Sequence, residues 1–277
     1  MTRRELLALA AAAPVLEARP AADRFLLITL SGAPAQTDTF DPKHYTPFEP
    51  GMLARNLFGA CRSIPTAISG VRIAEGLENI AAVLDRGAII RTVAARAGEP
   101  HVPAQRRLAG RLRLERLAAP TFAAQLEAAA RRVIARPAML HAALPFVPFA
   151  GFDTHDRGAD RTAQMKRAID APVARLIRDL ESSGALASTL VVVAPEFGRT
   201  VRPAAVIRTR DDYGYHEHFH AAFSVLLFGA GVQRGRVHGR TADEHPMVPV
   251  EKPVPVDAVA AMIGAAVSGG ARYGSIL

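Results

Sequence analysis

Short apolar runs alternate with amphipathic helical segments along this chain, and this alternation constrains the fold more than any other feature. The strand-like runs are rich in Val, Ile and Leu and are closed by polar or glycine residues; they are 24–30, 88–93, 189–194 and 223–228. The segments with apolar residues at helical spacing are 72–84, 121–134, 161–182 and 256–267. Strands that alternate with helices predict an α/β domain whose central sheet is covered on both faces.

The segment 161–182 has the strongest helical pattern, since its apolar residues form one stripe and its charged residues face away from it. Pro172 is expected to kink this helix and Gly184 to end it. The Gly-rich run 229–235 lies late in the chain and opens no helix, so it predicts a turn between strands rather than a dinucleotide-binding loop.

The first 22 residues are predicted to be a signal peptide, and 23–277 a single domain. Arg3 and Arg4 precede the apolar run 6–16, and small residues follow it. The paired arginines match the twin-arginine pattern, whose route carries folded proteins. We therefore expect a periplasmic or secreted protein with no membrane span after signal removal, because no run reaches the ~30 Å of a bilayer core. The alternative is an ordinary amphipathic first helix.

Charge and cysteine content exclude several classes of protein. The chain carries 34 basic and 26 acidic residues, a net charge of +8, but the basic residues form no stripe and have no interleaved aromatics. Nucleic acid is therefore not an expected partner. Cys61 is the only cysteine, so an intramolecular disulfide and a thiolate zinc cluster are both excluded.

Carboxylates and imidazoles gather in four segments. The segments 31–42 and 196–200 follow predicted strands, 214–220 precedes one, and 151–156 precedes the long helix. In open α/β sheets, ligands bind beyond the carboxyl ends of the strands. Mixed oxygen and nitrogen donors suit zinc, manganese, iron, magnesium or calcium. Each segment also has a simpler interpretation: Asp153 as a helix cap, Glu196 as an ion-pair partner of Arg199 or Arg202.

Three alternate histidines give the more specific signal, which is His216, His218 and His220. On an extended segment, alternate side chains point the same way, so these imidazoles are able to converge on a metal. The alternative is a loop of separately hydrogen-bonded histidines.

The order of these motifs resembles the DUF1501 family. Gly-Phe-Asp-Thr-His at 151–155, Ala-Pro-Glu-Phe-Gly-Arg-Thr at 194–200 and Gly-Arg-Thr-Ala-Asp-Glu at 239–244 occur in the family's order, after an opening Asp-Thr-Phe-Asp-Pro-Lys at 38–43. The family is placed with the alkaline phosphatase and sulfatase superfamily. The resemblance implies a three-layer sandwich with a mostly parallel central sheet between helices. It also implies one or two divalent metal ions at the strand ends and hydrolysis of phosphate or sulfate esters.

The resemblance also implies roles for individual residues. The metal ligands it suggests are Asp38 (with Asp41 as a rival), Asp153, His155, Glu196 and His218. Arg199 is expected either to hold an anionic group or to orient Glu196. His101 resembles a family histidine but is left outside the metal set, as a structural residue.

The superfamily's nucleophile has no clear counterpart in this chain. Thr37 is the candidate we name, with Ser31, Thr39 and Ser69 open, whereas Cys61 is expected to be a buried small hydrophobe. The chain is also shortened between about residues 91 and 122. Two hypotheses follow: an exported metal-dependent hydrolase of small anionic esters, or a non-catalytic periplasmic relative that keeps the fold and binds or assembles.

Overall fold

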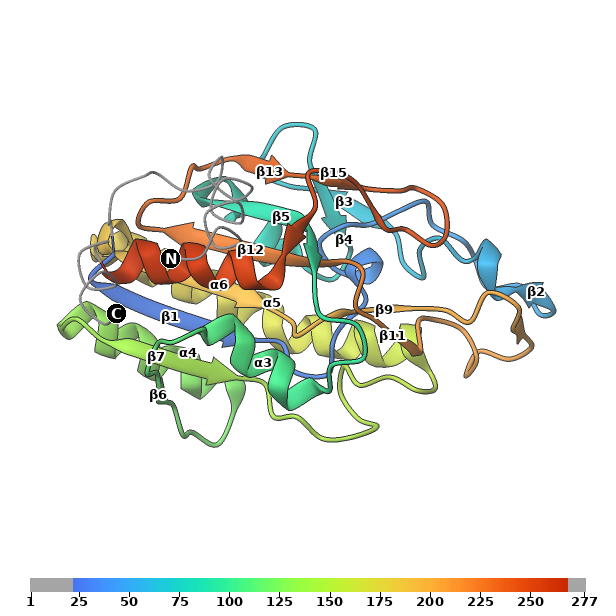
Figure 1. Cartoon of the computed structure of the whole chain (residues 1–277), viewed down its shortest axis with the longest axis horizontal. Coiled ribbons are helices and arrows are strands. Elements are labelled where there is room, and N and C mark those ends of the chain that lie inside the picture. Colours follow the sequence, from blue (N-terminus) through green and yellow to red (C-terminus); the bar gives the residue numbers. More distant parts are fainter. Residues whose placement is uncertain (1–21, 269–277) are drawn as a thin grey trace.

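A central eight-stranded sheet lies between two layers of helices in the computed structural model, which describes residues 22–268 (Figure 1). The strand order is β13-β5-β12-β8-β1-β7-β6, with β16 beside β5. The strands are β1 (Arg24–Thr29), β5 (Gly87–Ala94), β6 (Glu115–Arg116), β7 (Met139–Ala143), β8 (Thr189–Ala194), β12 (Phe223–Gly229), β13 (Arg236–His238) and β16 (Val254–Pro255). The predicted signal peptide, except for its last residue, lies outside the described residues.

All strands of this sheet except β12 run in the same direction. β1 pairs in parallel with β7 and β8, and β5 pairs in parallel with β13 and β16. β12 runs antiparallel to both of its neighbours, β5 and β8. The predicted mostly parallel sheet is thus confirmed, and the carboxyl ends of β1, β5, β7 and β8 meet at one edge.

Helices cover both faces of the sheet. One face packs against α2 (Glu78–Ala81), α4 (Phe122–Ala135) and α5 (Gly158–Ser182), and the other against α3 (His101–Ala109) and α6 (Val256–Ser268). β1 shows why, since Leu26 and Ile28 belong to one apolar core and Phe25 and Leu27 to the other. Full burial of an apolar side chain of this kind stabilises the folded state by about 1.5–3 kcal/mol relative to leaving it exposed. Because β1 has such side chains on both faces, helices must cover both faces of the sheet. The three-layer α/β prediction is confirmed.

Most of the predicted elements are present. The four strand-like runs correspond to β1, β5, β8 and β12, and three of the four helical segments correspond to α4, α5 and α6. Thr121 caps α4, because its Oγ1 accepts from Ala124 N at 3.1 Å, and α5 is followed by Gly184 in the left-handed conformation (φ +75°). Residues 229–235 form the predicted turn, between β12 and β13.

The prediction of one helix over 72–84 is wrong. The segment forms β4 (Arg72–Ala74), which pairs with β3 (Ser63–Pro65), then the short α2 and a 3₁₀ turn. Gly76 adopts φ +85° and interrupts the helical course. Asp170 on α5 then accepts from Asn79 N at 3.0 Å and Ile80 N at 2.8 Å, which fixes the start of α2.

Smaller elements complete the loops at the edge where the strands end. They are the antiparallel pairs β9 (Gly198–Thr200) with β11 (Glu217–Phe219), β2 (Met52–Leu53) with β10 (Val206–Ile207) and β14 (Arg240–Thr241) with β15 (Pro249–Glu251), and the 3₁₀ turn η1 (Gln36–Asp38). Within residues 22–268, no helix has the length and apolar character that a bilayer crossing requires.

Candidate metal centre

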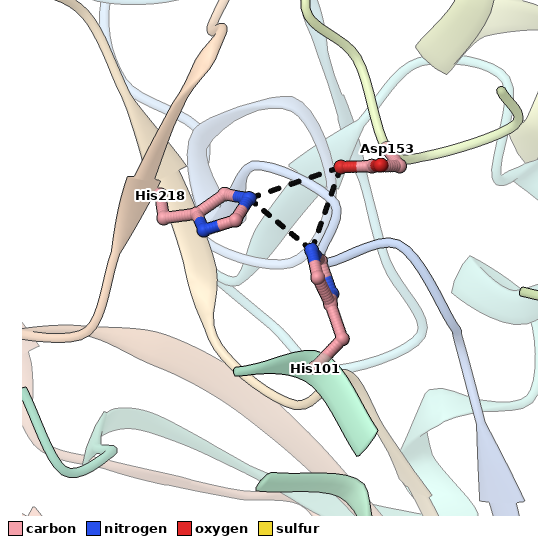
Figure 2. Close-up of side chains that lie close together, drawn as sticks. All are labelled: His101, Asp153 and His218. Carbon is pink, nitrogen blue, oxygen red and sulfur yellow. Dashed lines mark hydrogen bonds and ion pairs between the residues drawn. The ribbon is translucent and has the colours of Figure 1, made fainter. Parts of the chain in front are cut away.

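Three side chains from separate segments direct donor atoms at one point: His101, Asp153 and His218, the donor cluster (Figure 2). His101 Nε2 lies 3.1 Å from His218 Nε2 and 3.5 Å from Asp153 Oδ1. His218 Nε2 lies 3.8 Å from the same oxygen. Ligands bound at about 2.0–2.1 Å around a tetrahedral ion lie about 3.3 Å from one another. The donor spacing therefore fits one small divalent cation.

The donor cluster lies beyond the carboxyl ends of the parallel strands. His101 begins α3, which follows β5, and Asp153 lies in the loop between β7 and α5. His218 is the middle residue of β11, directly opposite Arg199 on β9. This edge is where open α/β sheets bind their ligands, because loops from several parallel strands converge there.

Gly32 allows two of these loops to touch. It follows β1 with φ +105°, and a Cβ at this position would lie 2.4 Å from the backbone nitrogen of Asp153. Such a contact is impossible, so only glycine permits the approach. The Gly32 N–H then donates to Glu196 Oε1 at 2.9 Å, which joins the ends of β1 and β8.

Glu196 orients His101 instead of joining the three donors. Its carboxylate is fully buried, and Oε1 accepts a hydrogen bond from His101 Nδ1. With the proton held on Nδ1, the lone pair of His101 is on Nε2, which faces the cluster. Metal-binding histidines are typically held by a carboxylate in this way. Glu196 Oε2 is buried without a hydrogen-bond partner in the described part of the chain.

Arg199 holds Asp153 and the surrounding loops together. Its side chain is 1% exposed and bonds Asp153 Oδ1. It also donates to the carbonyl oxygens of four residues, at 3.0–3.2 Å: Gly32, Phe152, Thr154 and His216. All the guanidinium nitrogens thus have protein partners, and the structure places Arg199 as a support of Asp153.

The local charges keep the donors in their metal-binding protonation states. Burial alone would raise the pKa of Asp153, but the hydrogen bond from Phe149 N and the charge of Arg199 outweigh it and lower the pKa. Burial, with the nearby Arg199 and His101, lowers the pKa of His218 to about 4. At neutral pH the cluster therefore presents a carboxylate and a neutral imidazole, as cation binding requires.

His155 lies at the solvent side of the cluster. Its Nε2 is 3.0 Å from Asp153 Oδ1, and its side chain is 38% exposed. Its ring centroid lies 5.7 Å from that of His218. The sequence analysis placed Asp153, His155, Glu196 and His218 in one site, and the structure brings all four together. Asp153 does not cap α5, which begins at Gly158 after Arg157.

Asp38, also suggested as a metal ligand, lies in a different buried cluster. Its Oδ1 accepts from Ala60 N at 3.1 Å and lies 3.9 Å from Cys61 Sγ, and Lys166 Nζ is 3.2 Å from the same sulfur. Burial raises the pKa of Asp38 to about 6. Among residues 22–268, Asp38 has no hydrogen bond or ion pair to the donor cluster.

Two other suggested residues, Asp41 and Thr37, have no hydrogen bond or ion pair to the three donors within residues 22–268. Asp41 accepts a hydrogen bond from the hydroxyl of Thr241, which ties the loop after β1 to β14. Its Oδ1 also lies 3.5 Å from Lys43 Nζ and 3.4 Å from Arg91 Nε. Thr37, the candidate nucleophile, is 1% exposed in η1, out of contact with solvent.

Only one of the three alternate histidines joins the donor cluster. His216 Nε2 donates to the Asp212 carbonyl at 3.1 Å, and His220 Nε2 donates to the Glu99 carbonyl at 3.0 Å. β11 is confined to Glu217–Phe219, so His216 and His220 lie outside the strand and do not follow its alternation.

His101 is the donor that sequence reasoning left out. Its resemblance to a family histidine was the available signal, but nothing nearby in the sequence indicates a ligand. What makes it a donor is its contact with Glu196, 95 residues away. Phe146 and Phe197 also pack on its ring, with centroids at 4.6 and 4.7 Å.

Comparison with known proteins supports the family assignment. A family model described as "Protein of unknown function (DUF1501)" matches residues 22–124 and 111–268. No curated protein matches the chain.

Several solved structures have a similar fold. One is a protein in the alkaline phosphatase superfamily from Vibrio parahaemolyticus (9% identity, TM-score 0.43, covering 88% of this chain and 72% of that one). Another is Ps i-CgsB in complex with k-i-k-neocarrahexaose (11% identity, TM-score 0.46, covering 91% of this chain and 72% of that one). A third is the lipoteichoic acid synthase LtaP from Listeria monocytogenes (10% identity, TM-score 0.44, covering 90% of this chain and 78% of that one). These similarities concern the arrangement of sheet and helices and give no information on the site.

Proposed function

Because the chain belongs to the DUF1501 family, whose activity its description leaves open, we propose from the donor cluster that it is a metal-dependent hydrolase of phosphate or sulfate esters. The observation that carries this proposal is the convergence of His101 Nε2, Asp153 Oδ1 and His218 Nε2 at 3.1–3.8 Å from one another. Two imidazoles and one carboxylate suit zinc, manganese or iron.

Three protein ligands leave a position open for substrate, as in catalytic rather than structural metal sites. A divalent cation held by the donor cluster would supply Lewis-acid polarisation of an ester oxygen. The substrate class is a small anionic ester, which the net charge of +8 helps to attract.

The protein's own groups prepare this site in two ways. Glu196 keeps the proton of His101 on Nδ1, and Arg199 keeps Asp153 ionised and in place. His155 lies half-exposed with its Nε2 3.0 Å from Asp153 Oδ1, on the solvent side from which a substrate would approach. Thr37, the candidate nucleophile, is buried, so we propose that water attacks the phosphorus or sulfur. The bond from that atom to the ester oxygen breaks, and the protons of water are shared between the departing alcohol and the released phosphate or sulfate.

The same proposal includes export. The leader 1–22 has paired arginines before a short apolar run, which supports periplasmic or secreted localisation by the twin-arginine route. A fusion of residues 1–22 to a reporter protein, with Arg3→Lys/Arg4→Lys as the control, tests this part separately.

The hydrolase proposal is tested by metal content and hydrolysis measured on the same preparations. We expect about one zinc or manganese ion per chain, and hydrolysis of p-nitrophenyl phosphate or p-nitrophenyl sulfate. His101→Ala and Asp153→Asn should lose both, because each removes a donor. His44→Ala, which changes an exposed histidine, should lose neither.

Two results would overturn the proposal or redirect it. Retention of full metal content by both donor variants would refute the metal centre. Stoichiometric metal with no hydrolysis of either ester, under any of the ions tested, would favour the non-catalytic binding or assembly protein.

A further inference from the structure

Exposed apolar side chains gather beside the donor cluster. Within residues 22–268 the large apolar side chains that are exposed are Val102, Ile134, Val147, Phe149 and Val250. Three of them are close in sequence to the donors, because Val102 follows His101 and both Val147 and Phe149 lie in the loop that leads to Asp153. We name Val102, Phe146, Val147 and Phe149 the apolar rim.

The apolar rim contacts the imidazoles of the site directly. The ring of Phe149 lies 4.9 Å, centroid to centroid, from the ring of His155. The ring of Phe146 lies 4.6 Å from the ring of His101. An ester held at the donor cluster would therefore have its organic group beside these two phenyl rings.

Phe149 is held in its exposed position by the backbone. It has φ +59°, a left-handed conformation that bulky residues rarely adopt. Its N–H donates to Asp153 Oδ2 at 2.8 Å, and its carbonyl accepts from Arg161 Nη1 at 2.7 Å. With the backbone fixed at both ends, the ring remains 66% exposed instead of folding into the core. Strained residues that display a side chain next to a site commonly bind its ligand.

We propose that the apolar rim binds the organic part of the substrate, and that this part is an aromatic ring. This inference rests on the proposed function for the ester end only. A flat ring fits because phenyl side chains stack on other rings at centroid distances of about 4.5–7 Å, and because an apolar group covers exposed apolar area. A short polar alcohol would leave the rim exposed to water.

Binding of non-hydrolysable ligands tests the inference apart from catalysis. Phenylphosphonate and methylphosphonate carry the same anionic group and differ only in the ring. Calorimetric titration of the purified protein should show that phenylphosphonate binds about tenfold more tightly than methylphosphonate. Phe149→Ala should remove most of this difference, and Phe149→Leu, which keeps bulk without a ring, should remove about half. Ile134→Ala, an exposed apolar residue on α4, should leave it unchanged.

Hydrolysis of phenyl phosphate and methyl phosphate gives the second readout. Phenol is the better leaving group whatever the site, so the informative quantity is the change in the ratio of kcat/KM values between wild type and Phe149→Ala. The inference would be overturned if Phe149→Ala lost the same factor in kcat/KM on both esters, or if the wild type bound both phosphonates equally. Either result would leave the hydrolase proposal standing. Ring-dependent phosphonate binding without hydrolysis would sustain the inference and refute the hydrolase.

Discussion

Replacing Asp38 by Asn should stabilise the protein above pH 6, because the native state holds this carboxyl at a cost. Asp38 is buried, and burial raises its pKa from 3.8 to about 6 in spite of the opposing effects of Lys166, Ala60 N and Cys61. Between pH 4 and 6 the folded chain therefore keeps a proton that the unfolded chain has lost. The contribution of Asp38 to the free energy of unfolding therefore falls as the pH rises through this window and is level above it.

The size of the effect follows from the shift. A difference of about two pKa units at about 1.4 kcal/mol per unit gives about 3 kcal/mol at pH 7. Asp38→Asn should gain up to this amount at pH 7–8, since the net shift already includes the attraction of Lys166, and nothing near pH 3.5. The carboxamide oxygen still accepts from Ala60 N, so the hydrogen bond is kept.

Urea unfolding of wild type and variant at pH 3.5, 5, 6 and 7.5 measures the difference. Asp41→Asn is the matched control, because this carboxylate is equally buried but lies 3.5 Å from Lys43 and 3.4 Å from Arg91. The free energy of unfolding of Asp41→Asn at pH 7.5 should be lower than that of wild type, a change opposite in sign to that of Asp38→Asn. A loss of stability in Asp38→Asn at pH 7.5 would refute this reasoning. Loss of bound metal in Asp38→Asn would restore Asp38 as a candidate ligand.

Three further predictions concern the candidate metal centre. Glu196→Gln should weaken zinc binding about 10–100-fold, measured by competition with a chelating dye, because the amide holds His101 less firmly. Arg199→Met should lower the free energy of unfolding by about 3–5 kcal/mol in urea, since it leaves Asp153 buried without its partner; a loss below 1 kcal/mol would contradict this. His218 has a folded pKa of about 4 against 6.5. In the metal-free protein His218 therefore contributes a loss of stability as pH falls from 6.5 to 4, opposite in sign to the contribution of Asp38. The free energy of unfolding of His218→Gln relative to wild type, from urea unfolding, should therefore increase as pH falls through this range.

The buried parts of the fold are predictable because burial imposes a pattern on the sequence. All six residues of β8 are buried, and their continuous apolar run identifies the strand. α5 has one buried stripe over its length, which the helical spacing reveals. The segment 72–84 has similar spacing, but Gly76 and the contact from Asp170 decide its structure. Propensity there is outweighed by tertiary contacts.

Glu196 follows β8 and His218 lies in β11, so paired segments fix the positions of both. Asp153 lies in the long loop between β7 and α5, where Arg199 and the close approach of Gly32 hold it. Asp38 lies farther along the loop after β1, where η1 directs it toward Ala60. His101 depends on a contact across 95 residues, which no local pattern encodes.

The bonds of Arg199 have a consequence for when the site is assembled. Its guanidinium supplies a positive charge against Asp153 and joins three backbone segments around it, at Gly32, at Phe152 and Thr154, and at His216. The carboxylate thus has a counter-charge built into the chain, and the loops do not depend on a cation to stay in place. Under the proposed twin-arginine route, the chain would fold before export and a cation would bind afterwards.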